Sequence, residues 1–359
     1  MINMAKPIME AEEKQAVLEV LESGTLALGP RVAAFEEAFA KICGVRFAIA
    51  TSNGTTALHI AILAHNIGPG DEVITTPFTF IASANTILYA GAKPIFVDIE
   101  PRTFNIDISK IEKAITPKTK AILPIHLYGL CCDMKPIMEV ARKNNLAVIE
   151  DACQSHGATY EGKKTGSFET GTFSFYPTKN ITSAEGGMIT TNDEKLAEHC
   201  RILRNHGMRR RYYHEELGFN FRMTDVHAAI GLAQLHKLER FNTKRQANAA
   251  YYNIHLKGVI TPYVPDNCVH VYHQYTIRVP GGKRDALREH LKSQEIGTEI
   301  YYPVPIHQQS FYMKKYGSAQ HFPESEKAAA EVLSIPVHPS LTQSDLESVV
   351  SAINSFMGQ

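Results

Sequence analysis

The sequence of 359 residues has no excess of either charge, no framework spacing of cysteines and no long apolar run. Lys plus Arg number 37 and Asp plus Glu number 37, so no net charge favours nucleic acid or a membrane surface as a partner. The six cysteines include no CxxC pair, which predicts reduced thiols rather than a disulfide framework. No apolar run approaches the roughly 18 residues that span a bilayer, and no secretion signal opens the chain. We therefore expect a cytoplasmic globular protein.

Short β-branched runs alternate with helical segments through the first half of the chain. The predicted strands lie at 45–50, 72–77, 93–99, 121–129, 146–152, 171–176 and 187–192. Strands separated by helices form βαβ crossovers, so the pattern predicts an α/β fold with a mostly parallel seven-stranded sheet covered by helices. Helical spacing at 10–23 and 32–42 forms an N-terminal helical segment.

The second half of the chain has a different pattern. One long helix is expected over 225–253, followed by strands at 271–279 and near 298–303. Helices are expected at 284–294, 323–333 and 342–356. We therefore predict a large domain over 1–250 and a smaller C-terminal α+β domain over 251–359.

Two polar features fall where predicted strands end, at the edge where doubly wound sheets bind their ligands. SNGTTALH (52–59) is a glycine turn that opens into a helix, and such N–H groups favour a phosphate, although many of these turns bind nothing. VIEDACQSH (148–156) ends a strand in two acids. An acid at such a position usually faces solvent or caps the next element, and the alternative is that it holds a cationic ring nitrogen. Cys153 and His156 have a metal-like spacing, but two ligands without two more nearby do not make a zinc site. No metal is expected.

Lys179 closes a third feature, the turn FSFYPTKN (173–180), with Ser174 on the preceding strand. A lysine after a proline turn is ordinarily a surface residue. Beside an anion cradle and an acid, however, a reachable amine completes the set that pyridoxal 5'-phosphate (PLP) requires. That set is a phosphate site, a partner for the pyridine nitrogen and a Schiff-base lysine.

The segment from IEDACQSH to GGMITTND (149–193) resembles the core of the DegT/StrS-type nucleotide-sugar aminotransferases, PLP enzymes of fold type I. The resemblance covers nearly the whole chain and includes LESGTLALGPRVAAFEEAFA, TSNGTTALHIAILA, TPFTFIASANTI, LRNHGM, GFNFRMTDVHAAIGLAQL and YYPVPIHQQSFY. It implies a ping-pong cycle in which L-glutamate leaves as 2-oxoglutarate and its amino group passes to a nucleotide-linked keto sugar.

The resemblance also implies roles for individual residues. Lys179 would form the Schiff base and, once displaced, act as a free base, while Asp151 would keep the pyridine nitrogen protonated. The remaining cofactor contacts would be Gln154 at the ring or its 3'-oxygen, Phe80 on the ring face, and Gly54, Thr55, Ser174 and Asn220 at the phosphate. Asn220 would reach in from the second subunit of a homodimer with shared active sites.

Several alternatives stay open at this point. The basic, aromatic stretch RNHGMRRRYYH (204–214) is either a loop that meets the sugar diphosphate or a solvated face. Four further residues either line the substrate cleft or form structural hydrogen bonds: His206, Tyr302, His307 and His338. The segment NITSAEGGM (180–188) is more similar to family members that act on 4-keto-6-deoxy sugars than to those that act at C3. The sequence does not indicate whether the nucleotide is UDP, GDP or dTDP. A PLP-bound regulator or sensor without turnover is the non-enzymatic alternative.

Overall fold

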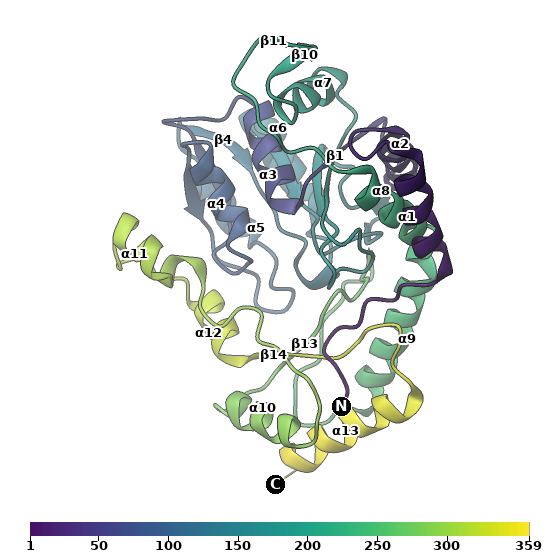
Figure 1. The fold of residues 1–359 in the computed structure, drawn as a ribbon. Helices are drawn as coiled ribbons and strands as arrows, with labels where there is room; N and C mark the ends of the chain where they lie inside the picture. The colour runs from purple at the N-terminus through teal and green to yellow at the C-terminus, as the bar shows by residue number, and fades with distance from the viewer. Residues whose placement is uncertain (359) are drawn as a thin grey trace.

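The computed structural model, which describes residues 1–358, is built around one seven-stranded sheet (Figure 1). In their order across the sheet the strands are β1 (Phe47–Thr51), β9 (Gly187–Thr191), β8 (Thr170–Ser174), β5 (Ala147–Asp151), β4 (Thr119–Ile122), β2 (Glu72–Thr75) and β3 (Lys93–Phe96). Strand β9 is antiparallel to both β1 and β8, whereas the other neighbours are parallel. The prediction of a mostly parallel seven-stranded sheet is confirmed.

Apolar side chains on the two faces of the sheet contribute to different hydrophobic cores. Val73 belongs to the core that includes α3 (Gly54–Ala64), whereas its neighbour Ile74 belongs to the core that includes α6 (Met134–Asn144). This alternation is what the period of two along a strand requires when helices cover both faces. The other helices around the sheet are α1 (Ala11–Ser23), α2 (Pro30–Cys43), α4 (Ala82–Tyr89), α5 (Ile108–Ala114), α7 (Glu194–Leu203) and α8 (Asp225–Leu235).

The single helix predicted over 225–253 is wrong, because the chain forms α8 and then α9 (Leu238–His255). The break lies at His236 and Lys237, neither of which is a helix breaker. The amine of Lys237 is 2.7 Å from a carboxylate oxygen of Glu13, on α1. A tertiary ion pair therefore accompanies a break that the periodic pattern does not show.

The C-terminal unit contains a two-stranded sheet of β13 (Tyr275–Arg278) and β14 (Val332–Ile335). Its helices are α10 (Arg284–Ser293), α11 (Ser310–Tyr316), α12 (Pro323–Glu331) and α13 (Gln343–Met357). The strand predicted near 298–303 is wrong, since Glu299 forms only an isolated bridge with Ser334 and β14 is the partner of β13. The last two residues of the helix predicted over 323–333 belong to β14.

Short elements complete the described chain. They are η1 (Leu127–Gly129), η2 (Ile306–Gln308), β6 (Thr159–Tyr160), β7 (Lys163–Lys164), β12 (Cys268–Val269), β10 (Met208–Arg210) and β11 (Tyr213–His214). None of the helices within residues 1–358 combines the length and hydrophobicity that a membrane span needs.

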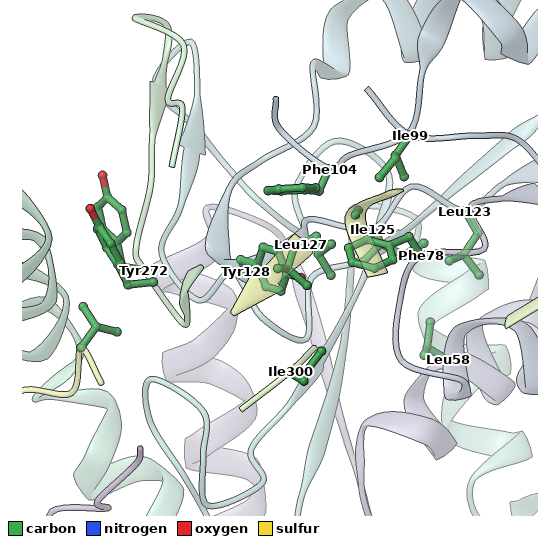
Figure 2. Close-up of a cluster of buried hydrophobic side chains, with 14 of the residues drawn as sticks. Leu58, Phe78, Ile99, Phe104, Leu123, Ile125, Leu127, Tyr128, Tyr272 and Ile300 are labelled. Carbon is green, nitrogen blue, oxygen red and sulfur yellow. The ribbon is translucent and has the colours of Figure 1, made fainter. Parts of the chain in front are cut away.

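One hydrophobic core continues from the sheet into the C-terminal unit. Figure 2 shows Leu58 and Leu123 of the large unit in the same buried cluster as Tyr272 and Ile300. The chain's first residues also lie against the C-terminal unit, where Ile2 forms a bridge with Ile296 (Figure 1). The division at residues 250 and 251 stays a prediction, and both contacts cross it.

Candidate active site

A cleft of about 790 Å³ opens beyond the carboxyl ends of β5 and β8, and the segment 299–303 of the C-terminal unit forms part of its wall. This volume suits a cofactor together with part of a substrate, since ligand pockets typically measure roughly 300–1,000 Å³. The residues predicted from the sequence that line it are Gly54, Thr55, Phe80, Asp151, Gln154, Ser174, Lys179 and Tyr302.

Lys179 lies in the turn that follows β8, and its N–H donates to the carbonyl oxygen of Tyr176 at 2.9 Å. Burial lowers the pKa of its amine, while Cys153 and Asp151 act in the opposite direction. A lowered pKa increases the neutral fraction of the amine, which is the nucleophilic and basic form. The side chain therefore has the chemistry of a Schiff-base lysine.

Asp151 is the last residue of β5 and is 6% exposed. The hydroxyl of Ser83 donates to Oδ2 at 2.7 Å, and the N–H of Cys153 donates to Oδ1 at 3.2 Å. These two bonds fix the orientation of the carboxylate. Within residues 1–358 no cationic side chain forms an ion pair with it, so a protonated ring nitrogen would supply the missing opposite charge.

Gln154 is held by two partners. The N–H of Tyr128 donates to Oε1 at 2.8 Å, so the amide oxygen points toward the backbone. Its Nε2 donates to the hydroxyl of Tyr302 at 3.1 Å and is the end of the amide that is free to donate to a ligand. Phe80 lies at the same wall, with its ring centroid 6.2 Å from that of Tyr302, and its side chain is exposed.

The N-terminus of α3 forms an anion cradle. Asn53 caps the helix by accepting the N–H of Thr56, which leaves the first N–H groups, those of Gly54 and Thr55, without helical partners. A Cβ atom on Gly54 would lie 2.7 Å from the Cβ of Ser174 and 3.1 Å from the Sγ of Cys153, so only glycine fits. A helix N-terminus next to a serine hydroxyl suits a phosphate group.

The other candidate residues lie outside the cleft. Asn220 is exposed and forms a backbone bridge with Asn205. The main chain of His206 bonds the loop around it, with its N–H donating to the carbonyl oxygen of Phe219 at 2.8 Å. Whether these two act in a partner's site stays a prediction.

Two buried histidines have structural partners instead. The Nε2 atom of His307 is 3.0 Å from a carboxylate oxygen of Glu326, and the Nε2 atom of His338 is 3.1 Å from the carbonyl oxygen of Asn3. Neither lines the cleft, so the geometry favours the hydrogen-bonded interpretation that the sequence left open. Of the four substrate-binding candidates, Tyr302 alone lines the cleft, and the other three are His206, His307 and His338.

The structure also brings in residues that the sequence analysis did not single out. Ser83 lies in the first turn of α4, three residues after Phe80, a proximity that could have indicated it. His273 and Glu299 lie in segments that the sequence predicted as strands but that are irregular at these two positions, so the pattern did not indicate them as site residues. Within residues 1–358 no group of three His, Cys, Asp or Glu side chains could hold a metal ion.

The residues of the cleft fit PLP. An anion cradle, a carboxylate without a cationic partner and an amine with a lowered pKa all line one cavity. Each matches one charged or reactive group of that cofactor.

Comparisons with known proteins agree with this interpretation. The model of the DegT/DnrJ/EryC1/StrS aminotransferase family matches residues 7–354. The chain is 45% identical to a pleiotropic regulatory protein of Geobacillus stearothermophilus, covering 97% of this chain and 95% of the relative. It is 44% identical to a GDP-perosamine synthase of Caulobacter vibrioides (99% and 98%) and 43% identical to a dTDP-3-amino-3,6-dideoxy-alpha-D-galactopyranose transaminase of Aneurinibacillus thermoaerophilus (97% and 96%). The crystal structure of S. venezuelae DesV in complex with a ketimine intermediate superposes with a TM-score of 0.94 at 38% identity, over 97% of this chain and 95% of that one.

Proposed function

The chain belongs to the DegT/DnrJ/EryC1/StrS aminotransferase family, and from this membership we propose that it transfers the amino group of L-glutamate to a nucleotide-linked 4-keto-6-deoxy sugar. It is a PLP-dependent sugar aminotransferase. The observation that carries the proposal is that Lys179 and Asp151 line the same cleft as the N-terminus of α3. Amination at C3 is the alternative for the position, and the name of the Aneurinibacillus relative supports it.

The residues of this chain divide the work of such a site. PLP, when bound, supplies a ring that accepts the electrons released at the amino-bearing carbon of the donor. Asp151 would hold the ring nitrogen in its protonated form, and Gln154 would donate Nε2–H to the 3'-oxygen. The free amine of Lys179 would take the proton from the donor carbon and return a proton to the acceptor carbon in the second half of the cycle.

A shared site in a homodimer is part of the proposal. Phe80 is 55% exposed and Tyr176 is 49% exposed, although both line the cleft. Large aromatic side chains of this kind are commonly covered by a ligand or a partner. The hairpin of β10 and β11, which carries three consecutive arginines (209–211), projects from one end of the molecule (Figure 1). We propose that it and Asn220 reach the cleft of a second subunit, where the arginines would meet the sugar diphosphate.

The test uses the purified PLP-loaded protein. Addition of L-glutamate should remove the visible absorption of the PLP–lysine adduct and release one 2-oxoglutarate per site. Nucleotide-linked 4-keto-6-deoxy sugars and 3-keto sugars, each with UDP, GDP or dTDP, are then added in turn, and the correct acceptor restores the absorption. A band that persists in glutamate would favour the non-enzymatic sensor, a role consistent with the name of the Geobacillus relative.

The matched control is Lys179→Ala. This variant should still bind PLP through the cradle and Asp151, but the cofactor should wash out on dialysis and no 2-oxoglutarate should form. Full turnover by Lys179→Ala would contradict the assignment.

A further inference from the structure

Arg245, on α9, is a cation enclosed in the protein, and within residues 1–358 it has no acidic partner. It is 5% exposed, and its Nη1 donates to the carbonyl oxygens of Tyr272 at 3.1 Å and His273 at 3.3 Å. Its Nε has no hydrogen-bond partner among the described residues. Burial lowers the pKa of the guanidinium to about 10, and no acid opposes that shift. Buried guanidinium groups are normally paired with an anion, because an uncompensated charge away from water is unfavourable.

A small cavity lies beside Arg245, behind the turn that carries Lys179. It measures about 20 Å³, which is enough for one water molecule or one monatomic ion. Lys6 and Lys179 also line it, and no Asp or Glu does. The nearby carboxylate of Glu13, which accepts a hydrogen bond from the wall residue Gln234, is already paired with a lysine. Arg245 is therefore a buried positive charge at the wall of this cavity, and no acidic side chain among the lining residues balances it.

We propose that this cavity binds a small monovalent anion, with chloride as the natural occupant, held by the guanidinium of Arg245. A phosphate or carboxylate is too large for the space, and the cradle for the cofactor phosphate lies in the separate cleft at α3. Because residues 178–180 also line the cavity, the ion would join α9 to the turn of Lys179. This inference goes beyond the aminotransferase function and does not depend on it.

Bromide can replace chloride and identifies itself by its anomalous scattering. Crystals of the PLP-loaded protein are grown with sodium bromide in place of sodium chloride, and data are collected at the bromine edge. We expect an anomalous peak in the cavity within hydrogen-bonding distance of Nε of Arg245. Water density without an anomalous peak there, or peaks confined to surface lysines as adventitious ions only, would overturn the proposal.

Solution measurements provide a second, independent test. The thermal midpoint of the PLP-loaded protein is followed as chloride replaces gluconate at constant ionic strength. Wild type should show a saturable rise of about 2 °C or more, because an ion that binds only the folded state stabilises it. Arg245→Met should lose this rise, whereas Arg240→Met, a change at an exposed position of the same helix, should keep it. A wild-type midpoint that does not respond to chloride contradicts the proposal, and if Arg245→Met does not fold, the bromide map decides.

Discussion

Glu150 is fully buried beside Asp151, and we predict that Glu150→Gln destabilises the protein strongly. Its Oε2 accepts from the N–H of Gly166 at 2.7 Å and lies 3.0 Å from Nε2 of His126, while Oε1 accepts from the N–H of Phe168 at 2.8 Å. The N–H of Cys132 donates to Nδ1 of His126, so Nε2 carries the ring proton and donates to the carboxylate. Both carboxylate oxygens therefore face donors only.

An amide cannot satisfy this set, because one of its two ends is itself a donor. In one orientation its NH₂ group faces the N–H groups of Phe168 and, at 3.4 Å, Glu169; in the other it faces Gly166 and His126. Leaving a buried donor without an acceptor costs about 1–3 kcal/mol, so two donors give about 2–6 kcal/mol. An unfolding entropy of about 2.1 cal/mol/K per residue then predicts a fall in the thermal midpoint of about 3–8 °C for a chain of 359 residues that unfolds as one unit.

The assay is calorimetry of the PLP-loaded protein at pH 6, with Glu169→Gln as the control. Burial raises the pKa of Glu169 to about 7, so at pH 6 this side chain is mostly protonated and an amide resembles it. The amide oxygen can still accept the N–H of Val148, and the control should melt within about 1 °C of wild type. If Glu150→Gln also melted within that range, the argument that its two oxygens hold the loop before β8 would be refuted.

Three further predictions address the site and its surroundings. Asp151→Asn should fold and bind PLP but lower kcat by about 100-fold or more, because a neutral amide does not keep the ring nitrogen protonated; a near-normal kcat removes Asp151 from the mechanism. The variants Lys179→Ala and Asn220→Ala should each be inactive alone. Mixed dimers of the two variants should regain activity, because one of their two sites then has both native residues. Mixed dimers that stay inactive would argue against active sites shared between subunits. The pKa of Glu169 is about 7 in the folded protein, whereas its ordinary value is 4.5. As pH rises, the unfolded chain therefore loses this proton before the folded protein does, so the stability of the protein falls between about pH 4.5 and 7. Glu169→Gln should flatten that part of a plot of midpoint against pH, and an unchanged slope would assign it to other groups.

The strands of the sheet could be predicted because each is a short β-branched run between turn residues. Their direction could not, since GMITT of β9 has the same local pattern as the parallel strands of the sheet but runs antiparallel to both of its neighbours, β1 and β8. The pairing of β13 with β14 joins Tyr275 to Ile335, sixty residues along the chain, and includes a side-chain contact of 2.8 Å between Thr276 and Ser334. Such pairings depend on tertiary packing, which hydrophobic periodicity does not encode.

The site residues on the large unit could be predicted for a related reason. Asp151 ends β5 and Lys179 follows β8 in one sheet, and the carboxyl ends of its parallel strands meet at one edge. Ser83 and the segment 299–303 reach the same place through a helix start and an irregular loop, so strand ends gave no signal for them. His307 and His338 show the converse, because a histidine has the same sequence signature whether it faces a ligand or a structural acceptor such as the carboxylate of Glu326 or the carbonyl oxygen of Asn3.

The charges in the cleft are unbalanced in a way that a bound cofactor corrects. Among the described residues Asp151 has two hydrogen-bond donors but no cationic side chain in an ion pair with it, and burial lowers the pKa of Lys179. The N–H groups at the start of α3 face the cleft without an acceptor from their helix. A cationic ring nitrogen would pair with Asp151, and a dianionic phosphate would accept hydrogen bonds from the N–H groups of α3. Covalent attachment of the cofactor would remove the need for Lys179 to carry a charge. The same reasoning applies behind the turn of Lys179, where Arg245 has a positive charge and an unpartnered Nε. Within residues 1–358, a buried carboxylate in the cleft lacks a cationic partner, and a buried Nε behind the turn lacks an acceptor. A ligand of matching charge would satisfy each of these groups.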